Sequence, residues 1–278
     1  MGGVLYIVAT PIGNLEDITL RALRILKEVH LIAAEDTRHT RTLLDRYGIG
    51  RPVTSYHEHN EKTKARALVE RLKRGQSIAL VSDAGTPLLS DPGYRLVREA
   101  IKAAIPVVPL PGPSAMTALL SVSGLATDRF VFEGFLPARR RERRERLGAL
   151  REEKRTMIFY EAPHRLKESL GDLLEILGDR EAVMGREITK IHEEFLRGRL
   201  SEMRTRVESE EPRGEITLAV GGSEGEAAPA QELITAEIEQ LRKKGLRVKE
   251  IAELLGEKFS RPKREIYRLA LEKKEPTA

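Results

Sequence analysis

Carboxylates, glycines and prolines gather where one apolar run of the sequence ends. The segment LVSDAGTPLLSDPG (80–93) continues the apolar run SIAL and contains two Asp, two Gly and two Pro. A loop of this kind presents backbone N–H groups, small side chains and carboxylates at the carboxyl edge of a sheet, where open α/β folds bind their ligands. We therefore expect this segment to contribute to a ligand site.

Three further segments of the same type follow other apolar runs. They are ATPIGN (9–14), PLPGPSAM (109–116) and FYEAPHR (159–165). Gly, Pro and small residues allow the backbone to approach a flat organic ligand closely. Any one segment could simply form a turn, but four together favour a binding site. The sequence has neither G-x-G-x-x-G after its first predicted strand nor G-x-x-x-x-G-K-[ST], so neither a dinucleotide nor a P-loop triphosphate is supported.

Predicted strands and helices alternate over the first part of the chain. This alternation is typical of a mostly parallel sheet with helices on both faces. Asp17, Asn60 and Asp91 are the predicted N-caps of three of these helices. The predicted strands are 4–9, 30–36, 53–57, 77–83 and 105–111, and the predicted helices are 17–29, 37–48, 61–75 and 91–103.

A second α/β block and a helical tail are predicted beyond residue 118. The tail, 232–275, follows a polar linker at 223–231, and its last two helices resemble a helix-turn-helix. We expect the tail to pack or to contact RNA rather than to recognise DNA. The predicted parts are therefore 1–118, 119–222 and 232–275. Strands of the second block are predicted at 129–137, 155–163, 181–188 and 214–222, and helices at 139–155, 163–177 and 201–209.

One segment dominates the charge of the chain. Residues 139–155 contain nine basic and four acidic residues, a net charge of +5, which equals the formal net charge of the whole chain. Such a segment is either a solvated helix with internal ion pairs or a surface that contacts the phosphates of a nucleic acid. On the second interpretation the contacting residues are Arg139, Arg140, Arg141, Arg143 and Arg144.

The composition narrows the class of protein. The absence of Cys excludes disulfides, Cys-ligated zinc and iron–sulfur clusters. Because no signal peptide or membrane span is recognisable, we expect a cytoplasmic location. The sequence HEH (57–59) alternates as on a solvated strand edge, so no metal site is predicted. Two Asn and three Gln beside 33% charged residues fit a thermophilic source.

The motifs together resemble one family. TPIGNLEDIT, AAEDTRHT, FEGFLP and the ligand-site segments above are similar to those of the bacterial 16S ribosomal RNA (cytidine-2′-O)-methyltransferases of the tetrapyrrole-methylase-like superfamily. The resemblance covers nearly the full chain. It implies two α/β domains with S-adenosylmethionine in the cleft between them, a homodimer, and methyl transfer to a cytidine ribose of 16S rRNA in the decoding region of the 30S subunit, with no membrane partner.

The resemblance also assigns a cofactor pocket. S-adenosylmethionine carries a sulfonium, an ammonium, a carboxylate and an adenosine, so it requires backbone amides, a helix N-terminus and small apolar walls. The residues that the resemblance assigns to this pocket are Pro11, Asp83, Ala84, Gly85, Thr86, Pro87, Gly112, Ser114, Ala115, Tyr160, Glu161 and Ala162.

Methyl transfer also requires alignment and deprotonation of the accepting hydroxyl. The candidates for these catalytic roles are Asp36, Arg38, Glu161 and Arg165, all in motif loops. Alternatively, Glu35 and Asp36 cap the helix that begins at Thr37, and Arg165 pairs with Glu161.

Two other functions share part of this pattern. A tetrapyrrole methyltransferase would use the same fold and cofactor, but the basic segment and the helical tail would then have no role. An RNA-binding module without catalysis would leave the motif loops unexplained, and aromatic residues are only 4% of the chain.

Overall fold

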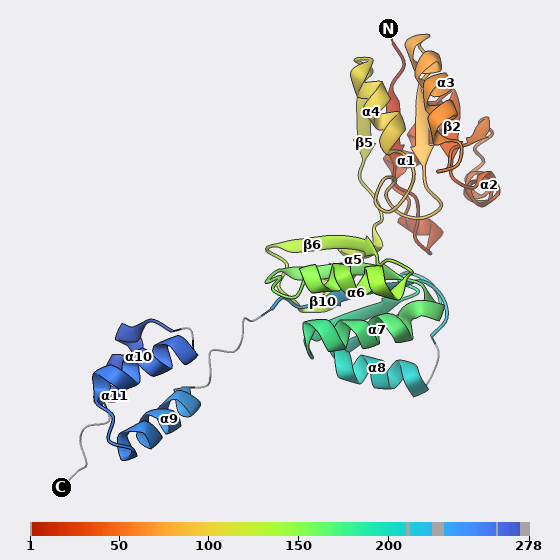
Figure 1. Cartoon of the computed structure of the whole chain (residues 1–278). Coiled ribbons are helices and arrows are strands. Elements are labelled where there is room, and N and C mark those ends of the chain that lie inside the picture. The colour runs from red at the N-terminus through yellow and green to blue at the C-terminus, as the bar shows by residue number, and fades with distance from the viewer. Residues whose placement is uncertain (1, 210–211, 224–230, 260, 273–278) are drawn as a thin grey trace. The chain divides into compact units, whose positions relative to one another are not determined.

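The computed structural model describes residues 2–209, 212–223, 231–259 and 261–272. The chain divides into two compact units, 1–222 and 223–278 (Figure 1). Most of the predicted linker, residues 224–230, lies outside the described residues. No helix in the described ranges is long and apolar enough to cross a membrane.

The first sheet of the larger unit is entirely parallel, as predicted. Its strands are β1 (Leu5–Val8), β2 (Leu31–Ala34), β3 (Val53–Ser55), β4 (Ile78–Val81) and β5 (Val107–Leu110), in the order β3-β2-β4-β1-β5. Helices α1 (Leu20–Glu28) and α2 (Thr37–Arg46) pack on one face, and α3 (Glu61–Lys73) and α4 (Tyr94–Lys102) pack on the other. Because both faces are covered, β2 and β4 are buried along their whole length.

Two of the predicted helix starts are wrong. Helix α1 begins after Thr19, whose hydroxyl accepts a hydrogen bond from Ala22 N (3.1 Å), and Asp17 lies in the preceding 3₁₀ turn η1 (Leu15–Asp17). Helix α4 begins after Gly93, so Asp91 is not its cap. Asn60 does precede α3, but its side chain accepts from His57 N instead of a helix N–H.

The second sheet is mixed. It contains β6 (Phe130–Phe135), β7 (Thr156–Glu161), β8 (Glu181–Arg186), β9 (Glu194–Arg199) and β10 (Ile216–Val220), in the order β6-β7-β10-β8-β9. Only β6 and β7 are parallel. The sequence does not predict strand β9, because EFLRGR is neither alternating nor strongly apolar.

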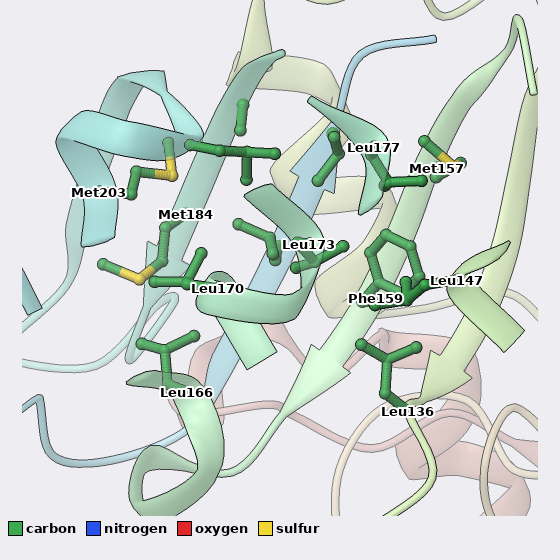
Figure 2. Close-up of a cluster of buried hydrophobic side chains, with 14 of the residues drawn as sticks. Leu136, Leu147, Met157, Phe159, Leu166, Leu170, Leu173, Leu177, Met184 and Met203 are labelled. Atoms are coloured by element: carbon green, nitrogen blue, oxygen red, sulfur yellow. The ribbon is translucent and has the colours of Figure 1, made fainter. Parts of the chain in front are cut away.

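Helices α6 (Arg140–Ala149), α7 (Pro163–Leu177) and α8 (Leu200–Ser209) cover one face of this sheet. Figure 2 shows this core, in which Leu166, Leu170 and Leu173 of α7 lie against the strands beside Phe159 and Met184. The predicted helix 139–155 is shorter than expected, since α6 ends at Ala149.

Helix α5 (Ala115–Ser123) covers the opposite face and contains the predicted boundary at residue 118. Its Leu119 is fully buried with Val183 of β8 and Ala219 of β10, and the same cluster includes Ile12 from the loop after β1. The helix therefore packs on the second sheet, although the sequence predicts that its first residues end the first domain.

The described residues of the smaller unit form three helices. Helices α9 (Gln231–Lys243), α10 (Val248–Lys258) and α11 (Lys263–Glu272) enclose a small apolar core that includes Ile238, Ile251 and Ile266. Helix α11 follows α10 after four residues, of which residue 260 lies outside the described residues.

Candidate active site

The four motif loops line one cavity of about 430 Å³ in the larger unit. The loops after β4 and β5 contribute one side, and the ends of β6, β7 and β10 contribute the other. Nine of the twelve predicted cofactor residues line it: Asp83, Ala84, Gly85, Thr86, Ser114, Ala115, Tyr160, Glu161 and Ala162. Pro11, Pro87 and Gly112 are not among the lining residues.

Backbone contacts hold the loops together at the cavity. Thr10 and Gly85 exchange two backbone hydrogen bonds of 2.9 and 3.0 Å, which tie the loop after β1 to the loop after β4. Gly85 has φ +78°, a conformation that favours glycine. The Thr86 hydroxyl donates to Pro113 O at 3.2 Å and ties the β4 loop to the β5 loop. A Cβ at Gly112 would lie 2.9 Å from that of Ala9, so this glycine permits close packing behind the cavity.

The cavity is acidic on its first-sheet side. Glu35, Asp83 and Asp91 all line it. Burial, followed by the nearby charges of Asp91 and Asp83, raises the pKa of Glu35 to about 7. Burial is also the main reason that the pKa of Asp91 is raised to about 6. A cation bound here would offset the mutual repulsion of these carboxylates.

Ser114 provides a polar group in the wall of the cavity. It precedes the first residue of α5, but its side chain makes no capping hydrogen bond. Its Oγ is buried and has no hydrogen-bond partner of ordinary geometry among the described residues, although the Tyr160 hydroxyl lies close enough for the two groups to interact. Because buried hydroxyl groups in folded proteins are almost always hydrogen-bonded, this oxygen is available to a ligand.

Aromatic side chains form the opposite wall. Tyr160 lines the cavity together with Phe135, and their ring centroids lie 5.6 Å apart in an edge-to-face arrangement. Phe132 makes a second such contact with Tyr160, at 5.1 Å. The rings give the cavity a flat apolar wall.

Glu161 is the one predicted catalytic residue that lines the cavity. It ends β7 and is only 3% exposed. Its Oε2 accepts from Ser169 Oγ at 2.5 Å, its Oε1 accepts from Ala162 N at 2.9 Å, and Arg165 Nε lies 3.4 Å from Oε1. Arg165 also donates to Leu136 O. The predicted pairing of Arg165 with Glu161 is therefore present, and it holds the carboxylate in place.

Asp36 and Arg38 do not line the cavity. Asp36 precedes α2, accepts from Arg38 N at 2.8 Å and forms an ion pair with the Arg38 guanidinium, which is 90% exposed. The hydrogen bonds from Arg38 lower the pKa of Asp36 to about 2. Asp36 is thus a helix cap, and only its backbone N–H reaches the site, where it donates to Asp83 Oδ1 at 2.9 Å.

Several residues of the cavity are not predicted by the sequence. The sequence indicates only helix capping for Glu35, and Asp91 lies in a predicted ligand segment but is expected there to cap a helix. The β10 residues enter the site because β10 pairs with β7, with Ile216 opposite Glu161, and single-sequence patterns do not show this pairing. The residues that line the cavity beyond the predicted cofactor set are Ile12, Glu35, Leu89, Ser90, Asp91, Phe135, Pro163, Gly214, Glu215, Ile216 and Thr217.

The basic helix α6 is largely neutralised by carboxylates. Asp172 of α7, itself 2% exposed, accepts from Arg143 (2.8 Å), Arg144 (2.9 Å) and Arg140 (3.4 Å). The expectation that Arg143 contacts phosphate is corrected, because its side chain is 1% exposed and buried against Asp172. Arg144 is shared between Asp172 and Glu175. Arg139, Arg140 and Arg141 are exposed.

Comparisons with known proteins show which family the chain is similar to. Residues 4–204 match the family model of Tetrapyrrole (Corrin/Porphyrin) Methylases. A protein of Synechocystis named Ribosomal RNA small subunit methyltransferase I is 48% identical over 97% of this chain and 98% of its own length. The protein of the same name from Thermotoga maritima is 51% identical and covers 80% of this chain and 100% of its own length.

Solved structures share the fold at lower sequence identity. The crystal structure of diphthine synthase has a TM-score of 0.61 at 16% identity and covers 79% of this chain and 90% of its own. Uroporphyrin-III-C-methyltransferase from Thermus thermophilus has a TM-score of 0.57 at 21% identity and covers 79% of this chain and 94% of its own. From its sequence, its two sheets and the cavity that its motif loops line, the chain belongs to the tetrapyrrole methylase family and, within it, to the proteins named ribosomal RNA small subunit methyltransferase I.

Proposed function

We propose that this protein transfers a methyl group from S-adenosylmethionine to the 2′-hydroxyl of a cytidine ribose in 16S rRNA, within the decoding region of the 30S subunit. The observation that carries the proposal is the cavity that all four motif loops enter, acidic on one side and aromatic on the other. We further propose a cytoplasmic homodimer as the working form. The names of the curated relatives support a ribosomal RNA substrate.

The residues present fit this cofactor. S-adenosylmethionine carries a positive sulfonium and a positive ammonium. The carboxylates of Glu35, Asp83 and Asp91 line the cavity and suit these charges. The unpartnered Ser114 Oγ and the N-terminal end of α5 suit a polar or anionic group. Small residues and the Tyr160 ring suit an adenosine. When bound, S-adenosylmethionine supplies a methyl group activated by the positive sulfur.

The residues of the chain must align the accepting hydroxyl and take up its proton. The RNA hydroxyl must be aligned behind the methyl group and must lose its proton. We assign proton acceptance to Glu35, because a carboxylate with a pKa of about 7 is a base well matched to neutral pH. This residue replaces Asp36 and Arg38, whose side chains are not among those that line the cavity.

Glu161 and Arg165 have a different role in this proposal. Both oxygens of the Glu161 carboxylate are already engaged, by Ser169 Oγ on one side and by Ala162 N and the Arg165 guanidinium on the other. We propose that this pair orients the ribose and excludes water at the end of β7. The buried position of Glu161 is consistent with an orienting role.

The experiment that tests the proposal compares three methyl acceptors. Purified protein is incubated with methyl-labelled S-adenosylmethionine and with 30S subunits, free 16S rRNA or a precorrin. We expect labelling of the ribosomal substrates and none of the tetrapyrrole. Labelling of the precorrin alone would establish the tetrapyrrole function, and cofactor binding without transfer to any acceptor would favour a binding module.

A further inference from the structure

RNA that reaches the cavity needs cations that are not already paired. On α6 the guanidinium groups of Arg143, Arg144 and Arg146 form ion pairs with carboxylates. Their charge is offset within the protein, so they attract phosphate less strongly than isolated cations would. The exposed Arg141 of α6 forms no ion pair in the described part of the chain, but it stands alone on that helix, whereas several such cations lie together on the first sheet's helices α3 and α4.

Helices α3 and α4 are neighbours, and a groove of about 850 Å³ is lined by their residues. Five basic and two acidic side chains line it. Arg95 pairs with Glu61 at 3.3 Å and Lys102 pairs with Glu99 at 2.9 Å. The other three basic residues, which form no ion pair in the described part of the chain, are Lys62, Arg66 and Arg98.

The remaining acidic charge is small compared with the basic charge. The hydrogen bond with Lys102 is the main cause that lowers the pKa of Glu99. The nearby charges of Arg98 and Arg66 also lower this pKa, by less. Even so, the groove carries a net positive charge, since five cations face two carboxylates. A positively charged groove between two helices suits a polyanion.

An aromatic ring stands in the same groove. Tyr94, the first residue of α4, is 65% exposed and lines the groove with the basic residues. Exposed tyrosines beside basic side chains offer a flat surface on which an unpaired RNA base can stack. The helix does not need this ring for its core, because α4 packs through Leu96 and Ala100.

The groove adjoins the cavity through a rigid connection. Asp91 lines the cavity and Tyr94 lines the groove three residues later, so their Cα atoms are at most about 11 Å apart. Glu61 Oε1 accepts from Gly93 N at 3.3 Å and Arg95 N at 3.4 Å, which fixes α3 to the start of α4. Gly93 has φ +144°, and a Cβ there would lie 2.9 Å from Leu80 Cδ2, so the turn between the two sites is tightly packed.

We propose that the groove between α3 and α4 binds the single-stranded backbone of the substrate RNA next to the cavity. Lys62, Arg66 and Arg98 contact phosphates, and Tyr94 stacks on a base that neighbours the methylated nucleotide. This inference rests on the proposed function, because it names where the RNA substrate of that reaction lies.

The test replaces the three unpaired cations in the full-length protein. The variant Lys62→Gln/Arg66→Gln/Arg98→Gln is assayed for methyl transfer to 30S subunits at several salt concentrations. We expect KM for the subunit to rise at least tenfold, and the slope of log KM against log salt to fall by about 2, as expected for three lost contacts to single-stranded phosphates. The Kd for S-adenosylmethionine, measured by calorimetry, should change less than twofold.

A matched control removes the same charge from the opposite face of the first sheet. The variant Arg21→Gln/Lys27→Gln/Arg46→Gln changes exposed residues of α1 and α2. It should keep KM within twofold of the wild type. An equal rise in KM for both variants would show a general charge effect and overturn the proposal, as would wild-type kinetics in the groove variant.

Two further measurements distinguish base stacking and RNA binding from a contact between two copies of the chain at the groove. Tyr94→Ala should raise KM at least fivefold, and Tyr94→Phe, which keeps the ring, should raise it less. Sedimentation of the groove variant should match that of the wild type, since a changed oligomeric state would mean that the groove holds a second copy of this chain. If the wild type itself transfers no methyl to 30S subunits, the proposed function fails, whereas normal transfer by the groove variant refutes the groove alone.

Discussion

Ser114 connects the sequence motif PLPGPSA to the chemistry of the cavity. The residue borders the cavity at the start of α5, with its hydroxyl buried and unpartnered in the described chain. A large side chain at this position would occupy ligand volume without breaking an internal hydrogen bond of ordinary geometry.

Ser114→Tyr should therefore abolish S-adenosylmethionine binding while leaving the fold intact. The calorimetry is done with about 1 mM EDTA in the buffer, so that it also tests whether cofactor binding requires a metal ion. Ser121→Tyr, on the exposed side of the same helix, is the control and should bind normally. Binding by Ser114→Tyr, or loss of wild-type binding on chelation, would contradict this account of the cavity.

Glu35 makes stability depend on pH in an unusual direction. Its pKa is about 7 in the folded protein and near 4.5 when unfolded, so the folded state holds an extra proton between these values. Asp91, with a pKa raised to about 6, acts in the same direction. Their stabilising effect is fully present below the unfolded pKa values and is lost as the pH rises through about 6 to 7. The lowered pKa values of Asp36 and Glu153 matter only in more acidic solution.

We expect the Tm of the ligand-free protein to fall between pH 5.5 and pH 8, a window of about 2.5 units that spans these raised values. Glu35→Gln should reduce this fall, because a neutral amide has no proton to lose. Glu16→Gln, at an exposed position, serves as the control and should leave the fall unchanged. A Tm that rises over this window in the wild type would show that Glu35 and Asp91 are not shifted in this direction.

The two carboxylates of the proposed mechanism predict different kinetics. Glu35→Gln should lower kcat about a hundredfold and remove the pH dependence of kcat/KM that an essential base on the free enzyme produces. Glu161→Gln should lower kcat with the pH profile retained, since its role is orientation. Asp36→Asn, which keeps a good capping side chain, should turn over near the wild-type rate. Wild-type kcat in Glu35→Gln would exclude it as the base.

At the scale of elements, the ends of β4, β5 and β7 are predictable from the sequence because apolar runs are followed by Gly, Pro and small residues. The same reasoning fails where a local pattern gives the wrong helix start and where a contact joins distant segments. The order Asp-Pro predicts a helix cap at Asp91, because this pair commonly starts helices, yet Gly93 starts α4 and frees Asp91 for the cavity. The place of Arg143 depends on Asp172, which lies 29 residues further along the chain.

The contact between α6 and α7 yields a stability prediction. Asp172→Asn leaves the buried Arg143 guanidinium without its shortest ion pair, which should cost about 3 kcal/mol of unfolding free energy. Glu175→Gln removes only an exposed partner of Arg144 and should have little effect. Urea denaturation compares the two variants. Equal midpoints would mean that the buried network does not hold α6 on the sheet.

At the scale of the whole molecule, the compact unit 1–222 contains both sheets and the entire cavity. The Thermotoga maritima relative aligns with this chain over 222 residues, and this alignment covers 100% of the relative's own length. Residues 1–222 alone should therefore fold and bind S-adenosylmethionine with a Kd within about threefold of the full chain, since no described cavity residue is removed. Calorimetry on the shortened protein tests this, and a lost or much weaker affinity would assign the helical tail a part in the cofactor site.

The position of the transferred methyl group tests the central claim most directly. A methyl group on the 2′-oxygen blocks alkaline cleavage of the next phosphodiester bond, whereas a methyl group on a base does not. Ribosomal RNA labelled by this protein with methyl-labelled S-adenosylmethionine is therefore digested with alkali and separated. The account predicts that all label is found in alkali-resistant dinucleotides whose first nucleoside is 2′-O-methylcytidine. Label in mononucleotides, or next to any nucleoside other than cytidine, would contradict it.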